Sequence, residues 1–164
     1  MHNYEPDLPQ VYLQPGESFF ADQPTIIATI LGSCVGVTFW SASLRVGALC
    51  HAMLPKCPPH SLAGMSLANG RRYVDFCIHD LVQQFDELGV TRANVQVKLF
   101  GGADMLVHGA DPLHPSVGKQ NSETALELLH AEGYKVTSSS LGDSFGRKIK
   151  FNTGTGEVVL RRLI

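Results

Sequence analysis

Cys34 and His51 are the two residues of this 164-residue sequence that could act together as a nucleophile and a base. Cys34 lies in Gly-Ser-Cys-Val-Gly (residues 32–36), where small neighbours would let a substrate approach the sulfur closely. His51 lies in the apolar run 46–54, where a buried imidazole needs a partner for each ring nitrogen. A histidine hydrogen-bonded to a cysteine lowers the thiol pKa and provides the thiolate. The two residues are therefore candidates for nucleophilic catalysis.

Both residues also have an ordinary structural interpretation. Cysteine is among the most frequently buried residue types and often fills a strand as a small apolar side chain. A lone histidine in a core is commonly satisfied by backbone groups. Spacing alone leaves an active site and simple core packing as open alternatives.

A thiolate that attacks a carboxamide forms a tetrahedral oxyanion, which needs hydrogen-bond donors. The backbone amides of residues 32–35 could supply them, and Gly101-Gly102 is a second possibility. A third residue should orient the imidazole, and the polar candidates are Thr29, Ser33 and Asn121. The pattern singles out none of them.

Metal and nucleotide sites lack support in the sequence. No CxxC or HxxxH spacing occurs, and neither a GxxxxGK loop nor a GxGxxG after a strand is present. We therefore expect no metal and no cofactor, although a cluster can be imagined from Cys50, His51, Cys57, His60, Cys77 and His79.

The first half of the chain predicts strands followed by a helix. β-Branched and apolar residues favour strands over 25–31, 35–40 and 44–54, which we expect to form a meander. Three prolines make 55–64 a loop that leaves the histidine strand, where it could shape a mouth. Helical spacing of apolar residues follows from about Leu67 to Gly89.

The second half predicts a strand, a helix and a hairpin. Residues 95–100 alternate as a strand and run into Gly101-Gly102, where the backbone must turn sharply or approach something closely. Residues 121–133 indicate a helix with Asn121 or Ser122 as the N-cap. Residues 148–151 and 157–160 flank a turn, which is typical of a hairpin.

These elements indicate one layered domain of mixed β-sheet with two main helices, an α/β fold of the α+β type. The length fits a single domain, which we assign to residues 17–164. Residues 1–16 are polar and contain proline, so we expect a flexible N-terminal arm, in which Val11 to Leu13 could add a short edge strand.

Charge and hydropathy limit the classes of partner that this protein could bind. The formal net charge is −2, and the basic residues form isolated pairs instead of a stripe, which argues against nucleic acid. The longest apolar run, 25–31, is far shorter than a membrane span of about 20 residues. No basic-then-apolar leader precedes it, so we expect a cytoplasmic protein without membrane insertion.

Five motifs, in order and at fitting separations, resemble the CheD family of chemoreceptor glutamine deamidases. The resemblance spans about residues 12–163 and rests on Leu31-Gly-Ser-Cys34-Val, His51-Ala-Met-Leu-Pro55, Lys98-Leu-Phe-Gly-Gly-Ala103, Gly118-Lys-Gln-Asn121 and Gly146-Arg-Lys-Ile-Lys-Phe151. It implies hydrolysis of receptor glutamine side chains to glutamate by a Cys-His-Thr site like those of bacterial toxin deamidases. Cys34 would then be the nucleophile that forms a thioester, and His51 the base.

The resemblance also implies partners and a third catalytic residue. The substrate would be the cytoplasmic helical region of chemoreceptors, and some family members also bind a CheC-type phosphatase. The family's threonine lies six residues before the cysteine, where this chain has Ala28, and Thr29 lies five before. A shift of one residue along a strand turns a side chain to the opposite face unless a bulge intervenes. Thr29 is the candidate third catalytic residue.

Two other functions use the same residues differently. One is a non-catalytic or dual-role binding module for a CheC-type phosphatase or a receptor. The other is a small cysteine protease or transglutaminase-like enzyme, in which the same Cys-His pair acts on another bond or acceptor.

Overall fold

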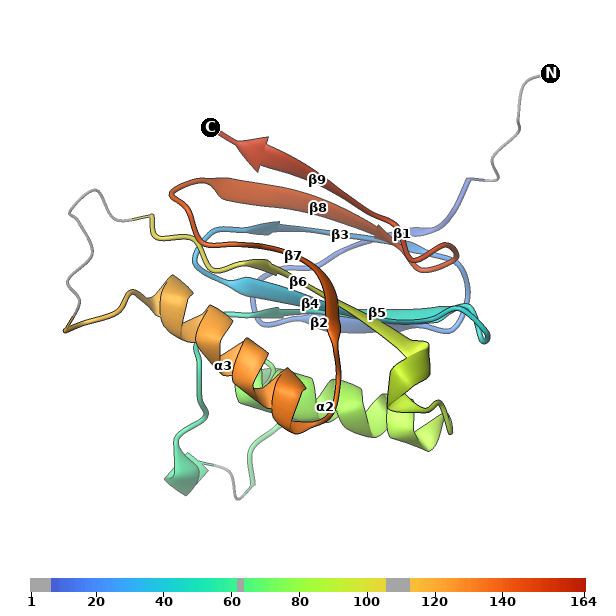
Figure 1. Ribbon diagram of the computed structural model, residues 1–164, viewed down its shortest axis with the longest axis horizontal. Helices are drawn as coiled ribbons and strands as arrows, with labels where there is room; N and C mark the ends of the chain where they lie inside the picture. Colours follow the sequence, from blue (N-terminus) through green and yellow to red (C-terminus); the bar gives the residue numbers. More distant parts are fainter. Residues whose placement is uncertain (1–6, 62–63, 106–112) are drawn as a thin grey trace.

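The chain folds into three layers, as seen in a computed structural model that describes residues 7–61, 64–105 and 113–164. A four-stranded sheet lies on one side, a five-stranded sheet lies in the middle, and two helices cover the outer face of the five-stranded sheet (Figure 1). The expected α+β architecture of layered mixed sheet with two main helices is confirmed.

The four-stranded sheet has the order β1-β3-β8-β9. β1 runs parallel to β3, and the other neighbours are antiparallel. The predicted C-terminal hairpin is present as β8 and β9. The strands are β1 (Gln10–Tyr12), β3 (Ile26–Leu31), β8 (Gly146–Asn152) and β9 (Val158–Leu163).

The five-stranded sheet has the order β2-β5-β4-β6-β7. β2, β5, β4 and β6 pair antiparallel, and β7 joins β6 in parallel after the chain has passed through a helix. The strands are β2 (Ser18–Ala21), β4 (Val35–Ser41), β5 (Val46–Ala52), β6 (Val95–Gly101) and β7 (Val136–Leu141).

The helices pack on the face of the five-stranded sheet that points away from the other sheet. The two main ones contact each other and the central strands, with Phe85 of one and Leu129 of the other fully buried. The helical segments are α1 (Leu67–Gly70), α2 (Val74–Glu87) and α3 (Val117–Ala131), with short 3₁₀ turns η1 (Pro59–Ser61) and η2 (Arg92–Asn94).

β5 is buried along its whole length because it is covered on both faces. Ala48, Cys50 and Ala52 belong to the core against the helices, whereas Leu49 belongs to the core between the two sheets. Side chains alternate along a strand, so His51 faces the same way as Leu49, toward the four-stranded sheet.

The expected meander of three strands is wrong. β3 pairs with β1 and β8 in one sheet, while β4 and β5 pair in the other. The chain therefore crosses from one sheet to the other at residues 32–34. The runs before and after residues 32–34 are both apolar. Such runs are expected whether the two strands pair in one sheet or lie in different sheets, so the pattern could not distinguish the two arrangements.

Helix α3 begins earlier than expected. Ser116 is the N-cap, and its hydroxyl accepts a hydrogen bond from the Lys119 amide at 3.2 Å. The expected caps Asn121 and Ser122 lie inside the helix instead, and both are buried.

Part of the segment expected to be an N-terminal arm belongs to the sheet. Gln10–Tyr12 form β1, and Leu13 is buried, with its backbone N–H donating to the Ala28 carbonyl at 2.9 Å. Residues 1–6 lie outside the described part of the chain.

Candidate active site

Cys34 lies in the connection between the two sheets, at the start of β4. Gly36 of β4 pairs with His51 of β5, so Cys34 is two residues along the strand from the partner of His51. Residues at this diagonal offset share a face of a sheet and are within reach of long side chains. The fold thus brings the Cys34 backbone next to the histidine strand, and the cysteine remains partly exposed.

The backbone around Cys34 is held by the end of β6. The amide of Gly102 donates to the Cys34 carbonyl at 2.9 Å, and the amide of Ala103 donates to the Gly32 carbonyl at 3.0 Å. A Cβ on Gly101 would lie 2.2 Å from the Cys34 carbonyl oxygen. The prediction that the backbone turns sharply or approaches something closely at Gly101-Gly102 is confirmed. The partner in the close approach is the loop of residues 32–34, called the cysteine loop below.

Thr29 contacts His51 across the space between the two sheets. Its Oγ1 lies 2.7 Å from Nδ1 of His51, and both residues are buried, at 0% and 2% exposure. The next residue, Ile30, is 43% exposed on the outer face. The register of β3 therefore turns Thr29, five residues before Cys34, toward the imidazole.

A second hydrogen bond fixes the direction of the first. The Thr29 hydroxyl donates its single hydrogen to the Leu13 carbonyl at 2.8 Å, because a carbonyl oxygen can only accept. Toward His51 the hydroxyl must therefore accept, so Nδ1 of His51 carries the proton. The neutral ring then has Nε2 unprotonated, which is the tautomer that a general base needs.

Burial keeps both candidate residues uncharged at neutral pH. Desolvation lowers the pKa of His51 to about 4, and the charge of Glu17 only partly opposes this effect. Desolvation raises the pKa of the Cys34 thiol, while the backbone N–H of Cys34 acts in the opposite direction. The resting pair is a thiol and a neutral imidazole, so the thiolate must form by proton transfer during attack.

The other two candidates for orienting His51 have different contacts. Asn121 donates from Nδ2 to the carbonyls of Ser33 and Met53, each at 3.0 Å, so its amide binds backbone on either side of the pair. Ser33 enters this arrangement through its carbonyl. The pattern did not identify the role of Leu13, because a backbone carbonyl leaves no signal in residue type.

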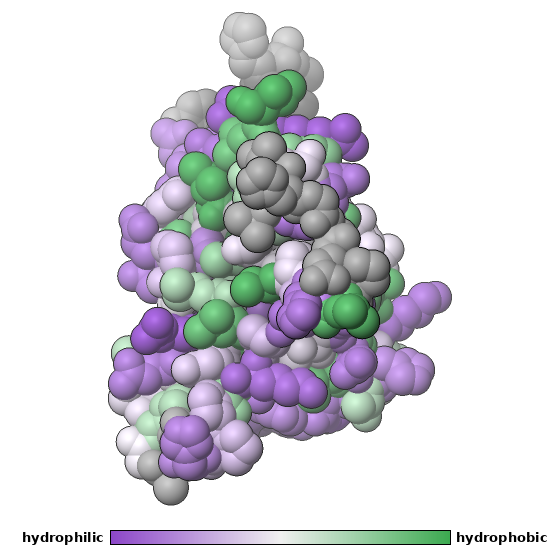
Figure 2. Space-filling view, turned by 90° about the vertical axis from the view of Figure 1, so that its left-hand side faces the viewer, coloured by the Kyte–Doolittle hydropathy of each residue, from purple (hydrophilic) through white to green (hydrophobic). Residues whose placement is uncertain are grey.

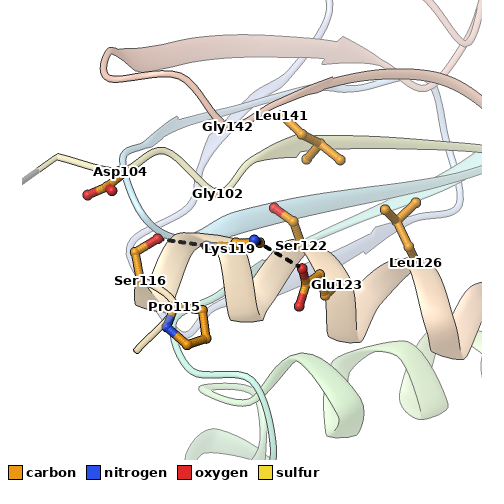
Figure 3. A pocket seen from close by; sticks show the side chains of 10 residues that line it. All are labelled: Gly102, Asp104, Pro115, Ser116, Lys119, Ser122, Glu123, Leu126, Leu141 and Gly142. Carbon is orange, nitrogen blue, oxygen red and sulfur yellow. Dashed lines mark hydrogen bonds and ion pairs between the residues drawn. The ribbon is translucent and has the colours of Figure 1, made fainter. Parts of the chain in front are cut away.

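A cavity of about 420 Å³ lies beside this backbone, between α3 and the ends of β6 and β7 (Figure 3). Gly102, which holds the Cys34 carbonyl, lines it, and Lys119 and Glu123 of α3 form an ion pair at its rim. It is lined by Gly102, Asp104, Pro115, Ser116, Lys119, Ser122, Glu123, Leu126, Leu141 and Gly142.

Exposed apolar side chains surround the same end of the molecule. Met105, Leu113 and Val117 are 53%, 84% and 43% exposed, and Met105 lies close to Gly32. Figure 2 looks onto this end and shows hydrophobic residues interspersed with polar ones.

Among the described residues, no three His, Cys, Asp or Glu side chains are grouped so that they could hold a metal ion. No described helix is both long and apolar enough to cross a membrane.

Comparison with known proteins identifies the family of this chain. The family model described as CheD chemotactic sensory transduction matches residues 53–162. A Geobacter sulfurreducens protein named probable chemoreceptor glutamine deamidase CheD 2 is 46% identical over 158 residues, covering 96% of this chain and 92% of that protein. A Maridesulfovibrio salexigens protein named probable chemoreceptor glutamine deamidase CheD is 36% identical and covers 99% and 97%.

A solved structure shares the fold at low sequence identity. The YfiH protein of Bacillus licheniformis, described as hypothetical, superposes with a TM-score of 0.50 at 13% identity, over 78% of this chain and 51% of its own. The full-length similarity to named relatives and the match to the family model establish that this chain belongs to the CheD family.

Proposed function

We propose that this protein deamidates glutamine side chains on the cytoplasmic part of chemoreceptors, through a thioester on Cys34. One observation carries the proposal: the hydrogen-bond chain from the Leu13 carbonyl through Thr29 to Nδ1 of His51. It leaves Nε2 of His51 free to accept a proton, on the strand that neighbours Cys34. The names of the relatives supply the substrate class.

The first half of the reaction releases ammonia. Nε2 of His51 takes the thiol proton as Sγ of Cys34 bonds to the side-chain carbonyl carbon of glutamine. Backbone amides near Cys34 stabilise the oxyanion. The tetrahedral intermediate then collapses, the C–N bond breaks, and His51 returns the proton to the leaving nitrogen.

The second half regenerates the enzyme. His51 removes a proton from a water molecule, which attacks the thioester carbon, and the C–S bond breaks as the carboxyl group forms. The sulfur recovers its proton from His51. The net reaction converts glutamine and water into glutamate and ammonia, and the substrate gains one negative charge at neutral pH.

The proposal is tested by incubating the purified full chain with a receptor cytoplasmic fragment. We expect ammonia release and a mass increase of about 1 Da at each modified glutamine, as an amide becomes a carboxylate. Cys34→Ala should lower the rate by more than about 10³-fold, because it removes the nucleophile.

Matched variants and products separate the thioester mechanism from binding alone and from proteolysis. Cys57→Ala removes a different cysteine and should retain activity. Equal rates for Cys34→Ala and the unmodified protein would refute the thioester mechanism. Binding of the fragment without any deamidation would instead support the binding-module alternative, and peptide cleavage would indicate a protease.

A further inference from the structure

Asn121 ties the backbone beside Cys34 to the backbone beyond His51. Its side chain is fully buried, and its Nδ2 donates to the Ser33 carbonyl and to the Met53 carbonyl, each at 3.0 Å. Ser33 immediately precedes Cys34, and Met53 is the second residue after His51. One amide of α3 therefore connects the segment before β4 with the segment after β5.

The orientation of this amide is unambiguous. Both of its partners are carbonyl oxygens, which cannot donate, so the nitrogen must face them and both of its hydrogens are used. The oxygen, Oδ1, is buried without a hydrogen-bond partner among the described residues. An unpaired buried acceptor lowers the stability of the fold. A group maintained at this cost, in contact with the residue that precedes Cys34, points to a role in activity.

Asn121 completes a set of three bonds to consecutive carbonyls of the cysteine loop. The Gly32 carbonyl is bound by the Ala103 amide, the Ser33 carbonyl by Asn121, and the Cys34 carbonyl by the Gly102 amide. In a trans peptide unit, the C=O and the following N–H point in opposite directions. Holding the Ser33 carbonyl toward α3 therefore directs the Cys34 N–H away from α3.

The Cys34 N–H and the Cys34 sulfur belong to one residue, so covalent geometry keeps them close together. A carbonyl carbon bonded to that sulfur would place its oxyanion near the same N–H. A preorganised backbone donor at this position stabilises the tetrahedral intermediate without reorganisation during the reaction.

We infer that Asn121 is a positioning residue that holds the Cys34 N–H as an oxyanion donor, and that its bond to Met53 keeps the end of β5 in place against the cysteine loop. The inference rests on the proposed deamidation. It assigns to α3 a part in the chemistry that is separate from orienting His51, which Thr29 performs.

The test compares Asn121→Asp and Asn121→Ala with the unmodified full chain. Asp keeps the shape and loses the donors, whereas Ala removes the side chain without adding a charge. We expect kcat for deamidation of the receptor fragment to fall by about 10²-fold in both variants, with KM changed less than about 2-fold, because the lost interaction acts in the transition state.

The rate of Cys34 alkylation by iodoacetamide is the second measurement. It should change if the substitution displaces the cysteine loop as a whole. This displacement builds no oxyanion, so its rate should stay within about 2-fold of the unmodified protein if only the N–H is misdirected. Mass spectrometry of the Cys34 peptide separates this thiol from the three buried cysteines. The control is Thr124→Val, a near-isosteric change one turn further along α3, which should change neither rate.

Each outcome decides one question. An unmodified protein without deamidase activity refutes the proposed function and leaves the inference without a basis. If the unmodified protein is active, unchanged kcat in both Asn121 variants overturns the inference. A parallel fall in kcat and in alkylation, or failure of both variants to fold, also overturns it, because Asn121 would then support the loop or the fold as a whole.

Discussion

At the residue scale, a few hydrogen bonds whose directions are determined hold the candidate site in place. The Leu13 carbonyl accepts from Thr29, Thr29 accepts from His51, and the unprotonated Nε2 of His51 follows as a consequence. Burial holds the pKa of His51 at about 4 and raises that of Cys34. The pair therefore starts uncharged, which distinguishes it from a cysteine site with a preformed thiolate and imidazolium.

Thr29→Val should lower kcat by about 10- to 100-fold, because the imidazole loses the acceptor that fixes its tautomer and orientation. Thr29→Ser keeps a hydroxyl and should retain most of the activity. Steady-state ammonia release from a receptor fragment measures both.

Thr153→Val is the matched control for this prediction. Thr153 is also fully buried, and its hydroxyl accepts from the Thr25 amide at 2.9 Å, beyond the opposite end of β3. This variant should lose stability but keep its kcat. Equal activity in Thr29→Val and the unmodified protein would show that Thr29 does not orient the base.

At the element scale, the sequence predicted what depends on residue type and missed what depends on pairing. The apolar runs indicated β3, β4 and β5 close to their observed bounds, and the glycine pair marked the close approach at the end of β6. Alternation could not reveal that the chain changes sheets after Leu31, because β5 is buried on both faces and β3 carries the apolar Ile30 on its exposed face.

The same limit explains why the candidate site was predicted only in part. Cys34 and His51 could be proposed from their types and small neighbours, whereas the orientation of Thr29 depends on the register of β3 with β8. Asn121 was assigned to a helix start because asparagine is a frequent N-cap. Its actual contacts arise from the packing of α3 on two other elements, which no local pattern encodes.

Gly102→Ala tests the packing of β6, α3 and the cysteine loop. Gly102 has a φ of +63°, and a Cβ there would lie 1.9 Å from Ser122 Oγ and 2.8 Å from the Gly118 carbonyl oxygen. The clash must move α3 or the backbone that holds Cys34. We expect a loss of about 3 kcal/mol or more in the free energy of unfolding and a lower kcat in the folded fraction.

Gly89→Ala controls for backbone strain alone. Gly89 has a φ of +75° with no atom within 4 Å of an added Cβ, so it should lose about 1 kcal/mol and keep its kcat. Urea denaturation and ammonia release separate the two effects. Equal losses in both variants would show that the close packing around Gly102 contributes nothing beyond its backbone conformation.

At the scale of the whole molecule, the three layers determine how the site responds to pH. His51 is buried because the five-stranded sheet carries it against the four-stranded sheet while the helices cover the other face. Unfolding exposes the imidazole to water, where its pKa returns to about 6.5. The protonation of the proposed base is therefore coupled to the stability of the entire fold.

The sign of this coupling follows from the two pKa values. Between pH 6.5 and 4 the unfolded chain binds a proton at His51 that the folded protein, with a pKa of about 4, excludes. Stability from this group is therefore complete above about pH 6.5 and is lost as the pH falls toward 4. Lowering the pH from 7 to 5 should remove about 2 kcal/mol from the free energy of unfolding through His51 alone.

The measurement is urea denaturation of the unmodified protein and of His51→Gln at pH 7 and pH 5. Gln is close in size and does not titrate, and the other ionisable groups are the same in both proteins, so the difference between the two pH dependences isolates His51. We expect the unmodified protein to lose about 2 kcal/mol more than the variant between these pH values. Parallel losses would mean that the folded protein accepts the proton as readily as the unfolded chain does, and that the two sheets do not desolvate His51.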